Sequence, residues 1–182
     1  MQESYTISHA TRALAQCRNI FAKKLTDYGA SWRIMRPMSI TDQLFIKAKR
    51  IRTLETDTAM VDEGILPEFM ALVNYSIIGL IQLDLGYADC ADISPEKALA
   101  LYDNYVRETL DLMTAKTHDY GDAWRDMRVV SFTDIILTKI QRIKQIENND
   151  GETLISEGID SNLMDIINYA LFAIIKLNDG EE

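Results

Sequence analysis

The chain has 182 residues, of which 47% are hydrophobic and 26% are charged. This composition is typical of a folded, water-soluble domain and excludes a disordered or collagen-like chain. The net charge of −9 excludes a general nucleic-acid binder, because contact with a phosphate backbone requires an excess of Lys and Arg.

Cysteine usage and hydropathy indicate the compartment. Cys17 and Cys90 lie far apart and without metal-ligand spacing, so we expect neither a zinc site nor a disulfide framework. The longest nearly apolar stretches, residues 70–83 and 166–177, are too short to cross a bilayer. The first ten residues lack the features of a secretory signal. We expect a cytoplasmic protein that does not bind membranes.

The chain contains an internal repeat. Residues 24–55 align without gaps with residues 116–147, and nearly half of the aligned positions are identical. After a two-residue insertion, the alignment resumes through an Asn-Tyr pair that begins at Asn74 and at Asn168. Such self-similarity indicates a tandem duplication. We place the repeats at about residues 8–83 and 95–177, joined by a linker at 84–94 that contains Gly, Asp and Pro.

The spacing of apolar residues at three- and four-residue steps predicts three helices in each repeat, and hence an all-α fold. The first helices are expected at about residues 8–26 and 95–117. In the second repeat, Ser94 is the expected N-cap, followed by Pro95. A glycine follows each helix, where the chain requires a left-handed residue; these are Gly29 and Gly121.

Each second helix is expected to start at a serine that is followed three residues later by an aspartate, because this pattern resembles a capping box. The expected N-caps are Ser39 and Ser131. The third helices begin near Pro67 and Ser161 and are almost wholly apolar. A three-helix unit this short does not enclose such a helix, but two units packed about a pseudo-twofold axis enclose both. We therefore expect one domain, a single six-helix bundle.

The loop after each first helix carries the motif Lys-x-x-Asp-Tyr-Gly-x-x-Trp-Arg-x-Met-Arg, at residues 24–36 and 116–128. Its aromatic rings are suited to stack on a flat ligand, and its guanidinium groups to bind phosphates. The alternative is that Tyr and Trp anchor the loop to the core while Asp and Arg pair with each other. The candidate ligand-binding residues here are Tyr28, Trp32, Tyr120, Trp124 and Arg125.

The second helix places a lysine and an arginine three residues apart on one face. These are Lys47 and Arg50 in the first repeat and Lys139 and Arg142 in the second. Because each position keeps its identity between the repeats, the pattern favours fixed partners such as phosphate or a carboxylate. The alternative is a pair of surface residues whose stems lie along apolar neighbours.

In the third helix of the second repeat, Asp165 and Asn168 lie one turn apart among apolar residues. A buried carboxylate is costly unless it is paired or bound to a metal. The first repeat has Ala71 in place of this aspartate, and residues 92–182 hold the acidic excess of the chain. Two interpretations stay open: Asp165 binds a metal in the second repeat only, or it pairs with Arg142 or Lys139.

The DYG-x-x-W loop, the K-x-x-R-I helix and the E-G then D-x-x-N-Y segment together resemble a known family. It is the bacterial "nucleotide modification associated" domain of unknown function, which occurs as a tandem pair in chains of about this length. The resemblance covers both repeats and implies a substrate class, nucleotides, without implying a reaction.

The third helix also resembles the last acidic helix of the MazG-like all-α nucleoside triphosphate pyrophosphohydrolases. These are Mg²⁺-dependent helical bundles that hold the metal with E-x-x-E on one helix and E-x-x-D on another. The resemblance implies Glu157 and Asp165 as Mg²⁺ ligands. The sequence departs from that pattern, because these two acids lie eight residues apart and Lys139-x-x-Arg142 stands where E-x-x-E is expected.

Three hypotheses follow from these patterns. The first is a Mg²⁺-dependent (deoxy)nucleoside triphosphate pyrophosphohydrolase, in which a metal-bound water attacks, cations neutralise the phosphates and an aromatic ring stacks on the base. The second is a non-catalytic protein that binds a nucleotide or another small phosphorylated molecule in the same pocket. The third is a helical protein–protein interaction module whose charges pair internally. A homo-oligomer is compatible with each. The residues assigned to these roles are Glu157 and Asp165 for the metal, and Lys139, Arg142, Arg125, Tyr120, Trp124 and Asn168 for the substrate, with Lys47, Arg50, Tyr28 and Trp32 as first-repeat equivalents.

Overall fold

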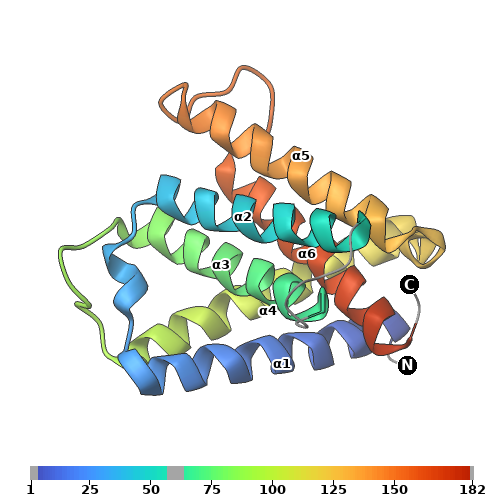
Figure 1. Ribbon diagram of the computed structural model, residues 1–182, viewed down its shortest axis with the longest axis horizontal. Coiled ribbons are helices and arrows are strands. Elements are labelled where there is room, and N and C mark those ends of the chain that lie inside the picture. The colour runs from blue at the N-terminus through green and yellow to red at the C-terminus, as the bar shows by residue number, and fades with distance from the viewer. Residues whose placement is uncertain (1–3, 57–63, 181–182) are drawn as a thin grey trace.

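A computed structural model describes residues 4–56 and 64–180, and within them the secondary structure is entirely helical. The all-α prediction is confirmed. Each repeat contributes three α-helices, and a short 3₁₀ helix lies between the first and second of each (Figure 1). The elements are α1 (Tyr5–Tyr28), η1 (Ser31–Ile34), α2 (Pro37–Thr56), α3 (Leu66–Leu85), α4 (Pro95–Tyr120), η2 (Ala123–Asp126), α5 (Val129–Glu147) and α6 (Ile159–Asn178).

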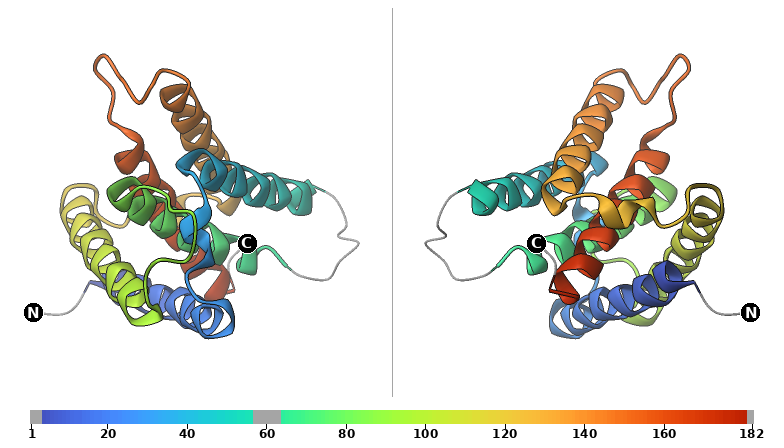
Figure 2. Two further views of the ribbon diagram at one scale, coloured as in Figure 1. Left: turned by 90° about the vertical axis from the view of Figure 1, so that its left-hand side faces the viewer. Right: turned by 90° about the vertical axis from the view of Figure 1, so that its right-hand side faces the viewer.

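The six helices form three layers of two (Figures 1 and 2). The pair α3 and α6 lies in the centre, α2 and α5 cover one side, and α1 and α4 cover the other. The central helices are the most apolar of the chain, so they are stable only where neighbours cover them on both sides. Each layer takes one helix from each repeat. The chain is therefore a tandem two-unit helical bundle, as the repeat predicts.

The pairing of α2 with α5 shows how the repeats are related. Thr41 donates to the Glu147 carboxylate at 2.7 Å, and Thr133 donates to the Glu55 carboxylate at 2.6 Å. Thr133 and Glu147 are the repeat equivalents of Thr41 and Glu55, so exchanging the repeats turns one bond into the other. Two neighbouring ion pairs are related by the same exchange of repeats. These are Asp42–Lys144 and Asp134–Arg52.

The observed starts of α2 and α5 differ from the predicted ones. The helices α2 and α5 begin at Pro37 and Val129, so Ser39 and Ser131 lie inside the first turn and are not N-caps. Pro37 supplies the physical reason in the first repeat, because its fixed φ and missing N–H suit the first helical position. The N-cap predicted at Ser94 is confirmed, since its side chain accepts a hydrogen bond from the Lys97 backbone N–H at 3.1 Å.

The chain leaves each first helix through a glycine with positive φ. Gly29 has φ 66° and ψ −161°, and Gly121 has φ 62° and ψ −152°. The positive φ is as predicted, but the extended ψ places both residues outside the left-handed helical region. This combination is open essentially to glycine alone. The glycines therefore direct both loops sharply away from the helix axis, toward the third helix.

The prediction that the apolar stretch at residues 70–83 is too short to cross a bilayer does not hold for the whole helix, because α3 is long and apolar enough to do so by length and composition alone. Within the fold, however, α3 buries 67% of its apolar window. It packs between α2 and α6, as the central helix of a folded protein does. Buried side chains from both repeats join in one hydrophobic cluster around it. At Gly79, an added Cβ atom would approach Leu163 of α6 to 3.1 Å, so the missing side chain allows the two central helices to lie close together.

Candidate functional site

Each repeat forms a pocket between its first helix, its motif loop and its third helix. The cavity in the first repeat, the first-repeat pocket, has a volume of about 380 Å³, and the cavity in the second, the second-repeat pocket, about 540 Å³. Both volumes suit a small molecule. The pockets are lined from equivalent positions, which include Lys24 and Lys116, Tyr28 and Tyr120, Trp32 and Trp124, Ala71 and Asp165, and Asn74 and Asn168.

The motif loop is held in place from the end of the third helix. In the first repeat, the buried Gln82 amide donates to the backbone carbonyls of Trp32, Arg33 and Met35, the last at 2.6 Å. In the second repeat, the Lys176 ammonium donates to the carbonyls of Arg125 and Met127 at 2.7 and 2.9 Å. Two different side chains at equivalent positions thus perform the same task. Satisfying these loop carbonyls fixes the pocket wall, because buried backbone acceptors need partners.

Both tryptophans face the core rather than the pocket opening. Trp32 is 8% exposed and Trp124 is 7% exposed. The Trp124 ring stacks on Phe172 with centroids 4.5 Å apart, and its indole N–H donates to Thr6 at 3.0 Å. The Trp32 indole N–H has no hydrogen-bond partner among the described residues. These contacts favour the interpretation that the tryptophans anchor the loop.

The tyrosines of the motif lie at the pocket rims. Tyr28 is 56% exposed and Tyr120 is 77% exposed, and each lines the pocket of its own repeat. Burial is the main cause that raises the pKa of Tyr28, with Tyr75 and Asp27 adding to the effect. An exposed ring at a pocket rim is free to stack on a flat ligand. Of the motif aromatics, the tyrosines therefore hold the positions suited to contact a ligand.

The polar end of the second-repeat pocket is built around Asp165. Its two carboxylate oxygens accept hydrogen bonds from Lys116 and Lys139, each at 2.7 Å. Burial is the largest single influence on the carboxyl group and raises its pKa, but the two lysines outweigh it and lower the pKa of Asp165 below its ordinary value. Of the two interpretations left open by the sequence, the structure shows the second, in which Asp165 pairs with Lys139. Lys116, contributed by α4, was not predicted to join them.

The first repeat carries its buried acid one helical turn earlier. Glu68 is 4% exposed and pairs with Lys47 at 3.3 Å and with Arg50 at 3.0 Å. The equivalent of Glu68 in the second repeat is Asn162, and the equivalent of Asp165 in the first repeat is Ala71. Lys47 and Lys139 therefore each reach a carboxylate, although the carboxylate comes from a different turn. A fixed carboxylate partner accounts for the retained lysine.

Asn168 is the least satisfied polar side chain of the second-repeat pocket. It is 4% exposed, and neither its Nδ2 nor its Oδ1 atom has a hydrogen-bond partner among the described residues. The equivalent amide in the first repeat, Asn74, donates to the Cys17 carbonyl at 3.1 Å and accepts from the Tyr102 hydroxyl at 2.7 Å. An unpaired buried polar group costs about 1–3 kcal/mol, so Asn168 requires an explanation.

The remaining predicted site residues lie outside the second-repeat pocket. Arg125 is exposed and lies over the Tyr5 ring, with its guanidinium carbon 4.1 Å from the ring centroid. Arg142 lines a third cavity, the loop groove, beneath residues 148–158, together with Lys139 and Glu157. Across residues 4–56 and 64–180, Arg142 forms no ion pair.

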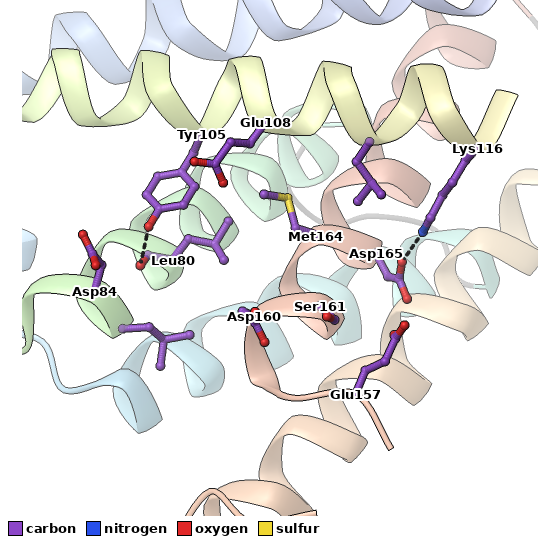
Figure 3. A pocket seen from close by; sticks show the side chains of 12 residues that line it. Leu80, Asp84, Tyr105, Glu108, Lys116, Glu157, Asp160, Ser161, Met164 and Asp165 are labelled. Atoms are coloured by element: carbon purple, nitrogen blue, oxygen red, sulfur yellow. Dashed lines mark hydrogen bonds and ion pairs between the residues drawn. The ribbon is translucent and has the colours of Figure 1, made fainter. Parts of the chain in front are cut away.

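A fourth cavity, the acidic groove, lies between α4 and α6 beside the end of α3 (Figure 3). Its volume is about 420 Å³, and five carboxylates line it with one lysine, Lys116. Figure 3 shows the bond between Lys116 and Asp165 at one end of this groove and the bond from the Tyr105 hydroxyl to the Leu80 carbonyl at the other. Lys116 thus stands between the acidic groove and the second-repeat pocket.

The predicted metal ligands, Glu157 and Asp165, both line the acidic groove. Within the described part of the chain, no three or more Asp, Glu, His or Cys side chains form a group that could hold a metal ion. A hard cation such as Mg²⁺ takes about six oxygens, and both oxygens of Asp165 already bind ammonium groups. The residues as arranged do not fit Mg²⁺; binding it at Asp165 would require at least one lysine to move away.

Fold and site together define an all-α protein made of two units, each with its own pocket. The family model described as "Nucleotide modification associated domain 1" matches residues 24–83 and 116–177, which is more than half of the chain. The chain therefore belongs to this family, as a tandem pair of a domain of unknown function. The comparisons do not show the resemblance to MazG-like enzymes. No curated protein and no solved structure matches the chain.

Proposed function

We propose that the protein binds a nucleotide, or a closely similar phosphorylated small molecule, in the second-repeat pocket. One observation carries this proposal. The pocket combines an exposed aromatic ring at its rim, Tyr120, with the ion pair of Lys116 and Asp165 at its polar end, where Lys139 of the adjoining loop groove binds the other oxygen of Asp165. The description of the family points to the same class of ligand.

The charges of this cluster favour an anion. Lys116 and Lys139 carry two positive charges, and Asp165 compensates one of them. The Lys139 side chain is 15% exposed and is held close to Asp165, whereas the Lys116 side chain is 45% exposed. A phosphate would draw Lys116 away from Asp165, and Lys139 would keep the carboxylate paired. Charge-assisted hydrogen bonds of this kind are about twice as strong as neutral ones.

Binding without turnover is supported better than hydrolysis. The pyrophosphohydrolase hypothesis assigns Mg²⁺ to Glu157 and Asp165, and that assignment requires the Asp165 oxygens that the lysines occupy. The interaction-module hypothesis expects the repeated charges to pair inside the fold without a cleft. Lys47, Arg50 and Lys139 do form ion pairs, but they do so beside open cavities.

Thermal unfolding with and without nucleotides tests the proposal. A ligand present at a hundred times its Kd stabilises the native state by about 2.7 kcal/mol, which corresponds to a rise in Tm of roughly 5–10 °C for a chain of this size. The panel contains nucleoside mono-, di- and triphosphates, each with and without Mg²⁺. A phosphate-release assay on the same samples detects turnover.

The matched variants are Lys116→Met and Lys24→Met, which remove the same charge from equivalent positions of the two pockets. Losing a charge-assisted hydrogen bond to phosphate weakens binding by about tenfold or more, so we expect Lys116→Met to lose about half of the shift or more, relative to its own unliganded Tm. Lys24→Met should keep it. No shift with any compound, or equal losses in both variants, would reject the second-repeat pocket as the binding site.

A further inference from the structure

The two pockets treat equivalent asparagines differently, and one substitution explains why. The Asn74 amide accepts from the hydroxyl of Tyr102, a residue of α4 that also stacks on Phe21 with ring centroids 4.3 Å apart. Helices α1 and α4 run unbroken to Tyr28 and Tyr120, where the repeats align, so the α1 equivalent of Tyr102 is Ala10. Alanine has no hydroxyl to offer.

The result is a carboxamide without partners on the wall of the second-repeat pocket. Asn168 lines this pocket, and both of its amide atoms lack partners within the described residues. A carboxamide presents one donor and one acceptor side by side. Its complement is a flat ring edge with an adjacent acceptor and donor, which is the arrangement on heterocyclic bases. In the first-repeat pocket, the buried side-chain donor without a partner among the described residues is instead the indole N–H of Trp32.

We propose that Asn168 recognises the base of the bound nucleotide and determines which base the protein accepts. This inference rests on the proposed function and adds to it the part of the ligand that the protein recognises, which is the base. Pairing with a base edge would recover the free energy that the unpaired amide costs in the unliganded protein. The amide atoms are covered by their neighbours, so a ligand must displace a side chain to reach them. Tyr120 then lies at the rim, placed to stack on a ring that enters the pocket.

Base recognition is tested by comparing AMP, GMP, CMP and UMP with ribose 5-phosphate, which carries the phosphate and sugar without a base. We expect the wild-type protein to bind at least one of the four nucleotides ten or more times more tightly than ribose 5-phosphate. Asn168→Leu, which keeps the shape and removes the polar atoms, should reduce this preference by tenfold or more. Its affinity for ribose 5-phosphate should stay unchanged.

Asn74→Leu is the matched control. It removes the bonds to Cys17 and Tyr102 and should lower the unfolding midpoint in urea while leaving the base preference intact. Asn168→Leu should unfold at the same or a higher urea concentration than the wild type, because no bond is lost in the unliganded protein. Asn168→Ala serves the binding test where the leucine variant does not fold.

The outcomes separate the two proposals. If the wild type binds none of the five compounds, the proposed function fails. If it binds them all equally, or if the base preference survives in Asn168→Leu, nucleotide binding stands and the role of Asn168 is overturned. A loss of base preference in Asn74→Leu equal to that in Asn168→Leu would also overturn it.

Discussion

At the scale of single residues, the repeats differ in where they place a buried carboxylate. Glu68 and Asp165 lie one turn apart in equivalent helices, yet each pairs with the lysine that the repeats share, Lys47 or Lys139. Both carboxylates line the pocket of their own repeat, but among the described residues only Asp165 also binds a lysine from the first helix of its repeat, Lys116 of α4. The two units therefore pair a pocket carboxylate with different cations, Arg50 in the first repeat and Lys116 in the second.

Asp165→Asn is expected to destabilise the unliganded protein. It removes the countercharge of two lysines, of which Lys139 is largely buried, and we expect a loss of about 1–3 kcal/mol after allowing for the solvent screening of Lys116. Chemical denaturation at pH 7 measures it. Asp160→Asn, an exposed acid of the same helix, provides the control for net charge. An Asp165→Asn variant as stable as the wild type would show that the cluster contributes nothing to stability.

The lowered pKa of Asp165 also determines whether its contribution to the stability of the fold rises or falls with pH. Because Lys116 and Lys139 lower it against the opposing effect of burial, the native state holds its proton less tightly than the unfolded state does. The contribution of Asp165 to stability is therefore fully present above about pH 4 and is lost as the pH falls further. In Asp165→Asn this part of the acid-induced loss of stability should be absent.

The sequence allows some of these residue contacts to be predicted and not others. The sequence predicts Lys139 as one of two cationic partners of Asp165, because a buried acid in an apolar helix requires a cation nearby. Lys116 was not considered, since its contact depends on how α4 packs against α6. The unpaired amide of Asn168 depends on Ala10, a residue of the other repeat, and no local pattern reveals it. The pairing of Glu68 with Lys47 was not predicted, because the position equivalent to Glu68 in the second repeat is Asn162, so the repeats do not share this acid.

At the scale of helices, the contact between α2 and α5 contains two half-buried acids, neither of which forms an ion pair within residues 4–56 and 64–180, although Arg52 lies near one and Lys144 near the other. Glu55 accepts from Thr133, and Glu147 accepts from Thr41. Burial is the main cause that raises the pKa of both glutamates, although the threonine hydroxyls act against it. Asp134 adds to the effect at Glu55, and Asp42 adds to it at Glu147.

The double variant Glu55→Gln, Glu147→Gln is expected to be more stable than the wild type at pH 7. A raised native-state pKa means that these groups stabilise the fold below the ordinary glutamate pKa and lose that contribution as the pH rises. Glutamine keeps the acceptor for threonine and carries no charge. A gain of about 1 kcal/mol would raise Tm by roughly 2–4 °C.

Thermal unfolding between pH 4 and pH 8 measures this gain, which should shrink toward pH 4. Glu152→Gln, at an exposed position, shows how much of any gain comes from lowering the net negative charge alone. A wild type that matches the double variant at pH 7 would contradict the expected cost of ionising Glu55 and Glu147 in this contact.

Helix existence was predictable from the sequence, but the helix ends were less so. The periodicity of apolar residues identified all six helices, since each must bury a stripe. The hydroxyl residues Ser39 and Ser131 were misleading, because Pro37 and the extended Arg128 provide a start two residues earlier. The structure also extends α3 to Leu85, so the linker begins at Gly86 rather than at residue 84.

At the scale of the whole molecule, the duplication accounts for the two-unit bundle. Its physical basis is that α3 and α6 are too apolar for one repeat to enclose, and each is covered by helices from both repeats. The exchangeable bonds Thr41–Glu147 and Thr133–Glu55 then set how the units meet. The layer order itself was not predictable, because the pattern of each helix gives the face that it buries and not the helix that covers it.

Separating the repeats tests whether either unit is stable alone. The fragments 1–91 and 92–182 each contain one central helix and lack the partner that covers it, so we expect neither to unfold cooperatively as a monomer. Mixed in equal amounts, they should recover helical content and a cooperative transition, since Arg33 of the first fragment bonds to Asp92 of the second at 2.7 Å and the α3–α6 contact re-forms. Circular dichroism and size-exclusion chromatography provide the measurements. A single fragment that unfolds cooperatively as a monomer would show that the repeats are independent domains, and the pockets would then be separable as well.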